Sequence, residues 1–399
     1  MKIVIKLLLV SLVFIALPKA TYGQGEAAVP FLLLAPDSRA GGIGESGAGL
    51  ADNSAAIFWN PAGIAFLTGT ELSITHSNWL PQFQLDLFYD YLTYRQYMEE
   101  LDGSVTASIT YMNFGEFAYT RDDPTVLGTF RSFDGALTLG YATKIHPDWG
   151  LGFNFRIIHS RLSGNNIQVG NEEGRGVATS VSFDIAAMWR PETFVLPLID
   201  EDIGNRFSIG MNLSNIGPKI YYIDQAQADP IPTNFRFGFA YKLIDEDFNQ
   251  LIYTLDFSKL LVSRKERIEV VSEDSTRTVS ESKEWYEALF YAWGDEPLSE
   301  ELRDIVTSMG FEYWYGQPGD FLFALRTGFF YEDPSYGNRK FVTFGAGIRY
   351  DIYGFDFSYI TTSVFKDGEN HPLSDTLRFT VLIGWGAVPE STRGLPRGI

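Results

Sequence analysis

Apolar and polar side chains alternate with a period of two residues along most of this chain. The clearest stretch runs from 376 to 385, and the same alternation recurs at 235–242 and 151–156. Successive side chains of a β-strand point to opposite faces, so a shift of one residue would turn charged groups toward the apolar face. Such a strand suits a wall between hydrocarbon and a polar interior, as in a transmembrane β-barrel.

Fourteen segments show this alternation, and most reach the roughly 9–11 residues that a tilted strand needs to cross a bilayer. The links between them alternate between short and long, as do the periplasmic turns and outer loops of such barrels. Two links fit less well, because 191–204 is long for a periplasmic turn and 80–82 is short for an outer loop. The expected strands are 70–79, 83–95, 103–113, 132–146, 149–160, 178–190, 205–214, 233–244, 250–261, 307–316, 320–331, 340–350, 353–362 and 375–386.

The N-terminus has the pattern of a secretory signal peptide. Lys2 and Lys6 begin it, an apolar run follows, and Thr21-Tyr22-Gly23 is the small-residue exit. A retained anchor is the alternative, but the run is shorter than the roughly 20 residues of a spanning helix. We therefore expect an outer-membrane protein whose segments are a cleaved signal peptide (1–23), a plug (24–68), a barrel (69–387) and a tail (388–399).

Composition excludes several other classes. After the signal peptide no apolar stretch reaches the 18 residues that a helical span needs, and aromatic residues make up 15% of the chain. The chain has no cysteine, which removes disulfides and thiolate zinc sites. The net charge of -19 argues against nucleic acid as a partner, since phosphates would be repelled. Acidic, solvated loops explain this charge.

Residues 27–68 have a different composition, rich in glycine and other small residues, without strand alternation. Glycine lets backbone approach backbone, so this segment can fill a barrel lumen, and Asn60-Pro61 favours a turn. Disorder is the alternative. It would leave the apolar runs 31–34 and 57–59 in water at a cost in free energy.

Short motifs in this segment resemble the N-terminus of the PorV family. The stretch Pro36-Asp37-Ser38-Arg39-Ala40-Gly41-Gly42-Ile43-Gly44-Glu45 carries the resemblance, together with Ala28 to Phe31 and Asn53-Ser54-Ala55. The element Asn60-Pro61-Ala62-Gly63 is also shared with FadL-type barrels, the related fatty-acid transporters. The plug residues singled out by the resemblance are Pro36, Asp37, Ser38, Arg39, Gly41, Gly42, Gly44, Glu45, Asn60 and Pro61.

The resemblance implies an adaptor of the type IX secretion system that carries out no covalent chemistry. PorV-like barrels receive secreted cargo proteins with a C-terminal targeting domain from a very large translocon barrel and pass them to a surface sortase complex. One alternative is a FadL-like importer of hydrophobic small molecules, which would need an apolar internal pocket and a kinked wall strand. Another is a lipid-modifying enzyme, which would need a Ser/His or metal constellation at the rim.

The long connection 262–306 is the main candidate for contact with cargo or another partner. Loops of this length are usually functional or disordered, and clustered aromatic residues anchor protein interfaces. Alternatively, its aromatic residues cap the barrel or lie in the aromatic belt at the membrane surface. The candidate residues are Trp285, Tyr286, Phe290, Tyr291 and Trp293.

Charged residues with lumenal parity have mixed signs, which predicts ion pairs that join plug and wall rather than a charged transport pathway. They are Asp90, Asp134, Arg156, Asp184, Arg206, Arg236, Lys242, Asp256, Glu312, Arg326, Arg349, Asp356 and Arg378.

Signals for catalysis or a cofactor are weak, and we expect neither. The run Gly42 to Gly47 satisfies G-x-G-x-x-G, but it lacks the flanking strand and helix of a dinucleotide site. The four histidines are far apart in sequence and belong to no metal or hydrolase motif. Carboxylate pairs at 122–123 and 172–173 fall in expected outer loops, where solvent or lipopolysaccharide-bound divalent cations account for them.

Overall fold

The computed structural model describes residues 27–119, 126, 128–164, 167–169, 172–174, 176–196, 200–224, 227–272, 275–317, 320–365 and 371–386. The expected signal peptide 1–23 and tail 388–399 lie outside these residues. No helix within the described ranges has the length and apolar character needed to cross a membrane.

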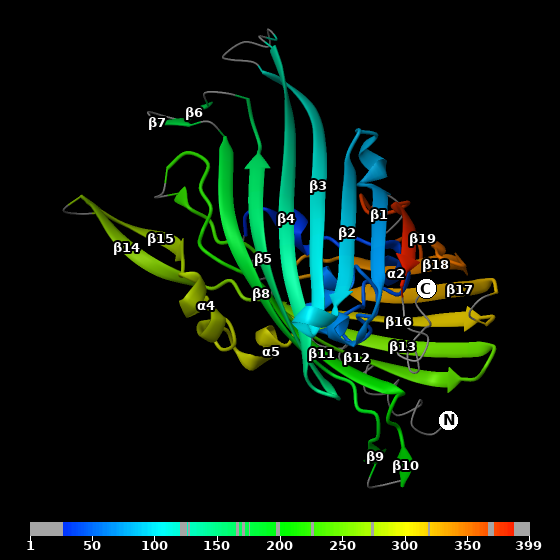
Figure 1. The fold of residues 1–399 in the computed structure, drawn as a ribbon. Helices are drawn as coiled ribbons and strands as arrows, with labels where there is room; N and C mark the ends of the chain where they lie inside the picture. The colour runs from blue at the N-terminus through cyan, green and yellow to red at the C-terminus, as the bar shows by residue number, and fades with distance from the viewer. Residues whose placement is uncertain are drawn as a thin grey trace.

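In the described part of the chain, fourteen strands form one closed antiparallel barrel in which neighbours along the chain pair with each other (Figure 1). The first strand pairs with the last, from Thr70 opposite Trp385 to Ser77 opposite Arg378, so the sheet has no free edge. All fourteen expected strands are confirmed. They are β1 (Thr70–Asn78), β2 (Phe88–Met98), β3 (Gly103–Tyr119), β4 (Gly128–His146), β5 (Trp149–Arg161), β8 (Val177–Trp189), β11 (Phe207–Ile216), β12 (Asn234–Asp245), β13 (Asn249–Leu260), β16 (Val306–Tyr315), β17 (Leu322–Tyr331), β18 (Lys340–Tyr350), β19 (Tyr353–Thr361) and β20 (Leu377–Trp385).

Side chains in these strands follow the expected two faces. In β5 the outward Phe153 and Ile157 are exposed, whereas the inward Asn154, Arg156 and Ile158 are buried. The outward face is apolar and the inward face mixed, so the wall can meet hydrocarbon outside and polar groups inside.

Strand β2 begins later than expected, at Phe88 rather than at residue 83. Pro81 opens a short helix, η4 (Pro81–Phe83), because proline suits a first helical turn but lacks the N–H that a strand would use. The link from β1 to β2 is therefore 79–87, which is no longer too short for an outer loop.

The register of β2 corrects one expected lumenal charge. Asp90 points outward, opposite His76, and its carboxylate lies 2.7 Å from the His76 ring nitrogen. The inward positions belong to Tyr89 and Tyr91, which are buried. Their hydroxyls bond to wall hydroxyls inside the barrel, at Thr110 and Ser108, so an aromatic residue takes the lumenal face here.

The second misfit, at 191–204, contains a small hairpin, β9 (Val195–Leu196) and β10 (Glu201–Asp202). It lies at the opposite end of the barrel from the tips of β3 and β4 (Figure 1). Longer connections at the β3–β4 end, which we assign as extracellular, carry further elements. These are β6 (Ile167–Val169), β7 (Glu172–Gly174), β14 (Arg264–Ser272), β15 (Ser275–Ser282), α4 (Trp285–Tyr291) and α5 (Leu298–Glu301).

Residues 28–66 run through the barrel as a plug of short helices, dark blue in Figure 1. Two polar side chains fix its turns, since the Asp37 carboxylate accepts the N–H of Ala40 and the Asn60 side chain accepts that of Ala62. Most of its buried apolar side chains, including Phe31 and Ile57, form one cluster with the inner wall, and Ile43 and Leu50 belong to a second cluster. The helices are η2 (Pro30–Leu33), α2 (Ser38–Gly42), α3 (Ala56–Trp59) and η3 (Pro61–Phe66).

Candidate functional site

Glycines let the plug backbone touch the wall backbone. A Cβ added to Gly328 of β17 would lie 2.0 Å from the backbone nitrogen of Gly44. A Cβ added to Gly210 of β11 would lie 2.0 Å from the carbonyl oxygen of Ala48. Gly44 itself has a φ of 75°, a left-handed conformation that glycine adopts at low cost. The small residues of the plug therefore set how closely it fits.

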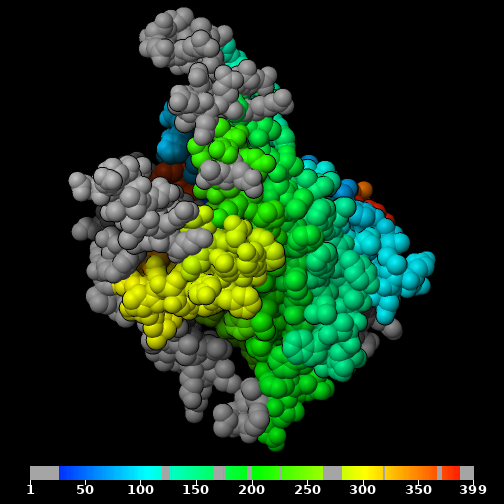
Figure 2. All heavy atoms as spheres, turned by 90° about the vertical axis from the view of Figure 1, so that its left-hand side faces the viewer, coloured from blue at the N-terminus to red at the C-terminus, as the bar shows by residue number. Residues whose placement is uncertain are grey.

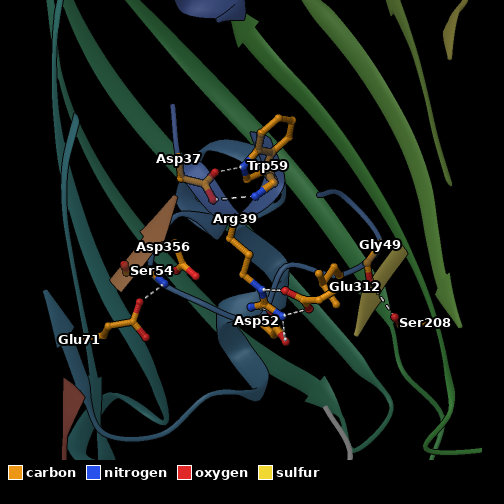
Figure 3. Close-up of polar contacts among 12 residues, drawn as sticks. Asp37, Arg39, Gly49, Asp52, Ser54, Trp59, Glu71, Ser208, Glu312 and Asp356 are labelled. Carbon is orange, nitrogen blue, oxygen red and sulfur yellow. Dashed lines mark hydrogen bonds and ion pairs between the residues drawn. The ribbon is translucent and has the colours of Figure 1, made fainter. Parts of the chain in front are cut away.

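A chain of buried ion pairs starts from Arg39 in the plug (Figure 3). The Arg39 guanidinium donates to both oxygens of Glu312, at 2.8 and 2.7 Å, and to Asp52 at 2.6 Å. Glu312 also accepts a bond from Arg326 at 2.7 Å. Two-pronged bonds between guanidinium and carboxylate fix position as well as charge, so Arg39 holds the plug in one register against β16.

The ionic chain continues along the wall. Arg326 donates to Asp356 at 2.7 Å, and Asp356 accepts a further bond from Arg349 at 2.5 Å. The chain Asp52, Arg39, Glu312, Arg326, Asp356, Arg349 alternates in sign, and its three acids balance its three bases. The indole of Trp314 lies beside three of these guanidinium groups, at 5.3 to 5.9 Å from its ring centre.

Other contacts fasten the rest of the plug. Asp37 accepts a bond from the Trp59 indole at 2.6 Å, and Glu71 of β1 accepts one from the Ser54 N–H at 2.7 Å (Figure 3). Glu45 pairs with Arg378 at 2.8 Å. Asp256 of β13 accepts the N–H groups of both Gly47 and Ala48 at 2.8 Å, and Ser208 donates to the Gly49 carbonyl at 2.7 Å.

The structure brings the predicted plug residues together inside the barrel. Pro36, Asp37, Ser38 and Arg39 are buried, and Glu45 is half-buried beside Arg378. Gly41, Gly42, Gly44, Asn60 and Pro61 are buried as well. Asn60 also donates to the carbonyls of Ala48 and Ala187, so the Asn-Pro turn is tied to the wall at β8.

Two acidic residues at this site were missed in the sequence. Glu71 could have been found, because Leu72 and Ile74 point outward in β1 and place Glu71 on the lumenal face. Asp52 lies in the plug, where no strand alternation marks which side chains face a partner. It is recognised only through its contact with Arg39.

The prediction of ion pairs among inward charges is confirmed for part of the set. Arg156 pairs with Asp184 at 2.7 Å, and Lys242 pairs with Asp245 at 3.3 Å. Asp256 binds plug N–H groups instead of an arginine side chain. Arg236 lies over the ring of Trp59, at 4.6 Å from its centre. Plug backbone and plug aromatic rings thus replace some of the expected ion-pair partners.

The run Gly42 to Gly47 serves this contact with the wall. The Gly44 N–H donates to the Thr343 hydroxyl at 2.9 Å, and the Gly47 N–H is bound by Asp256. Of the histidines, His159 points outward and bonds Thr179 at 3.0 Å, while His76 pairs with Asp90. Within the residues that the structure describes, no group of three or more His, Asp or Glu side chains is placed to hold a metal.

A cavity remains between the plug and the inner wall of β2 to β5. Its volume is about 10 Å³, roughly the room for one water molecule, and its lining mixes apolar rings with hydroxyls and a guanidinium. This is below the roughly 300–1,000 Å³ of ordinary ligand pockets. The cavity is therefore not the apolar pocket that a small-molecule importer would need. It is lined by Leu32, Phe58, Tyr89, Tyr91, Ser108, Thr110, Thr138 and Arg156.

The aromatic candidates of connection 262–306 lie outside the barrel. Figure 2 shows this region in yellow on the flank of the green wall. The ring of Trp293 meets that of Phe235 edge to face at 5.3 Å, and Phe235 has outward parity in β12. Trp285 contacts Tyr286, and the Lys283 ammonium lies 4.1 Å from the ring centre of Tyr291. All five candidates thus lie in α4 or just after it, away from the plug.

Comparisons with known proteins place this geometry in context. The family model described as "Type IX secretion system protein PorV" matches residues 23–267. No curated protein matches the chain in sequence. Similar solved structures include the toluene transporter TbuX of Ralstonia pickettii, with 10% identity, coverage of 88% of this chain and 98% of that chain, and a TM-score of 0.45. A FadL homologue of Pseudomonas aeruginosa has 10% identity, coverage of 88% and 97%, and a TM-score of 0.47.

Proposed function

Because the chain belongs to the PorV family of type IX secretion system proteins, we propose that it is an outer-membrane adaptor for secreted cargo. In this role it binds proteins with a C-terminal targeting domain as they leave the large translocon barrel and delivers them to the surface sortase complex. We also propose that residues 1–23 are removed on export and that the outer leaflet of lipid and lipopolysaccharide surrounds the barrel.

The observation that carries the proposal is the filled lumen. Residues 28–66 occupy the interior. The Arg39–Glu312 and Glu45–Arg378 pairs hold the plug against strands β16 and β20 of the wall. A barrel with such a plug has no route for a folded protein through its own lumen. Under this proposal the protein acts in secretion by binding other proteins at its surface.

Cargo contacts are proposed on the extracellular connections. Connection 262–306 is the first candidate because it is long and holds a hairpin, β14–β15, followed by helix α4. Deleting residues 285–293 is expected to leave the barrel inserted and to abolish cargo capture. Unchanged capture would show that residues 285–293 neither bind cargo nor hold this connection in place for it.

A matched pair of hairpins tests the adaptor role. One variant replaces β14 and β15 (264–282) by a short Gly/Ser linker, and the control shortens the β9–β10 hairpin at the opposite end. Each tagged protein is purified from its native membrane, and the co-purifying proteins are identified by mass spectrometry. The intact protein and the control should bring down a very large barrel and proteins with shared C-terminal domains, whereas the β14–β15 variant should lose the cargo. If no version carries these proteins, the adaptor proposal fails.

The importer is the second candidate, and one feature of the wall favours it. The pairing of β3 with β4 shifts between Asn113 and Gly115, where Gly115 has a φ of 86°, so β3 carries a bulge that bends a wall strand. An importer should co-purify with fatty acid or another apolar small molecule. Lipid extraction of the purified protein separates the two functions, because bound small molecule without cargo would favour import.

A further inference from the structure

Helix α4 buries small side chains and exposes large aromatic ones, which is the reverse of an ordinary surface helix. The buried side chains here are the small Ala288 within the helix and Ala292 directly after it, at 4% and 2% exposure. Its large aromatic residues face out, with Phe290 at 80%, Tyr291 at 59% and Tyr286 at 52% exposure. Surface helices of soluble proteins bury their large apolar residues instead. A contiguous exposed apolar patch of this kind marks a surface that contacts something outside the chain.

We define the aromatic pad as Tyr286, Phe290, Tyr291, Trp293 and Leu298. Leu298 begins α5 and is 75% exposed, so the helix that follows α4 also presents an apolar side chain. Trp293 is 48% exposed, and its indole N–H donates to the Leu289 carbonyl at 3.0 Å. That bond satisfies the one polar group of the indole within the chain and leaves its rings free for an apolar contact.

Two contacts place the pad on the outer side of the wall. Gly47 and Ala48 of the plug bind Asp256, so even-numbered positions of β13 face the lumen and Lys259 faces outward. The Lys259 ammonium is covered from outside by Glu301 of α5, at 2.9 Å. The contact of Trp293 with Phe235 is likewise on the outward face of β12. Both helices therefore lie against the flank of the barrel.

The pad adjoins the outward apolar side chains of β11 and β12, whereas the outward Tyr253 and Leu255 of β13 are buried. Below Phe235, toward the middle of β12, the outward positions are Phe237, Phe239 and Tyr241. On the neighbouring strand β11 the outward Met211 is 41% exposed. Trp and Tyr side chains at the outer end of such an apolar wall are typical of the boundary between acyl chains and headgroups. A helix with one aromatic face can lie in that boundary.

We propose that the aromatic pad rests in the outer leaflet of the outer membrane, at the boundary between acyl chains and headgroups. Lipid contact on this flank anchors connection 262–306 along the membrane surface and leaves β14 and β15 to reach away from it. The inference does not depend on the adaptor role. If that role holds, the pad positions the cargo-binding loop instead of binding cargo itself.

The absence of cysteine allows a direct test with single labels. Phe290→Cys carries an environment-sensitive fluorophore, and the full chain is reconstituted in phosphatidylcholine and phosphatidylglycerol vesicles that contain nitroxide-labelled lipid. Leu325→Cys, on an outward position of β17 with 64% exposure, reports full lipid contact. Phe117→Cys, 46% exposed near the tip of the long β3–β4 hairpin, reports a site in water.

We expect lipid nitroxide to quench the label at 290 to within about twofold of the label at 325, and to leave the label at 117 largely unquenched. Aqueous iodide should give the reverse order. Quenching at 290 by iodide alone, in vesicles that contain only this protein, would overturn the proposal and assign the pad to a protein partner.

A second variant separates lipid contact from simple misfolding. Tyr286→Ser with Phe290→Ser, labelled through Leu298→Cys, should lose most of the lipid quenching seen at 298 with the aromatic residues present. Barrel folding is checked by the gel-mobility difference between heated and unheated samples. A folded double variant with unchanged quenching at 298 would show that the aromatic residues do not anchor this flank.

Discussion

Replacing Glu312 by Gln removes a charge from the buried ionic chain and is expected to loosen the plug. The Glu312 side chain is fully buried and accepts three bonds, two from Arg39 and one from Arg326. Removing one partner of a buried ion pair costs about 3–5 kcal/mol. Each arginine keeps a second carboxylate, Asp52 or Asp356, so we expect the lower part of that range. A loss of about 3–4 kcal/mol changes the folding equilibrium constant by roughly 150- to 700-fold.

Two measurements check this expectation. The free energy of unfolding is obtained from urea titration in lipid vesicles, with the gel-mobility shift of the folded barrel as the readout. Conductance in planar bilayers reports directly on the lumen, and E312Q should open more often than the unchanged protein. Asp90→Asn is the matched control, because it removes the same charge from a pair whose side chains are 42% and 59% exposed. Exposed pairs contribute only about 0–1 kcal/mol.

The reasoning would be refuted by an E312Q protein that is no less stable than D90N and no more conductive. In that case the glycine contacts alone would hold the plug, and the ionic chain would make no net contribution. A steady open pore in the unchanged protein would contradict the filled lumen itself.

Three further predictions concern single contacts. Gly328→Ala should destabilise the barrel by about 1–3 kcal/mol through overpacking, since its Cβ would lie 2.0 Å from the Gly44 nitrogen. The control Gly128→Ala has no atom within 4 Å of its added Cβ and should leave the free energy of unfolding unchanged in the same urea titration. Trp59→Phe should cost about 1.5–3 kcal/mol, because it leaves the buried Asp37 carboxylate without its indole donor, and a loss no larger than that of D90N would argue against this. The N–H groups of Phe194 and Gly204 lower the pKa of Asp202 in the β9–β10 hairpin, so the stabilisation is present above the ordinary carboxyl pKa and is lost as the pH falls through the lowered value. The protection of these two amides against hydrogen exchange, measured relative to an unstructured chain at the same pH, should then fall in acid. Asp202→Asn should remove that pH dependence of the protection.

The wall could be predicted from the sequence because each strand has one lipid face. Leu377 to Trp385 show this most simply, since a shift of one residue would place Arg378 in hydrocarbon. The start of β2 was wrong because Pro81 and the left-handed Leu80 and Gln84 form a tight turn where alternation still looked regular. The predicted direction of Asp90 was wrong as well, because its side chain points outward and not into the lumen.

The partners inside the lumen could not be derived in the same way. Alternation gives the side of the wall on which Glu312 and Asp356 lie, but it does not say which plug residue meets them. That choice depends on how the plug sits against wall glycines such as Gly328, and so on contacts between residues far apart in sequence. The position of α4 outside the barrel could not be predicted from the sequence either. A loop shows no regular alternation of apolar and polar residues that would indicate the side of the barrel on which it lies.

The order of the contacts along the chain has a consequence for how the molecule is assembled. Arg39 emerges long before its partner, since Glu312 lies 273 residues further on, and Glu45 and Arg378 are 333 residues apart. Contacts over such separations form late, after the intervening chain is ordered. Until the last strands arrive, Arg39 therefore has only Asp52 of its own segment as a counter-charge, and Glu45 lacks Arg378. The plug is then fixed at the stage when the two ends of the sheet join. In an intermediate whose barrel is not yet closed, the plug would lack its contacts with Glu312 and Arg378.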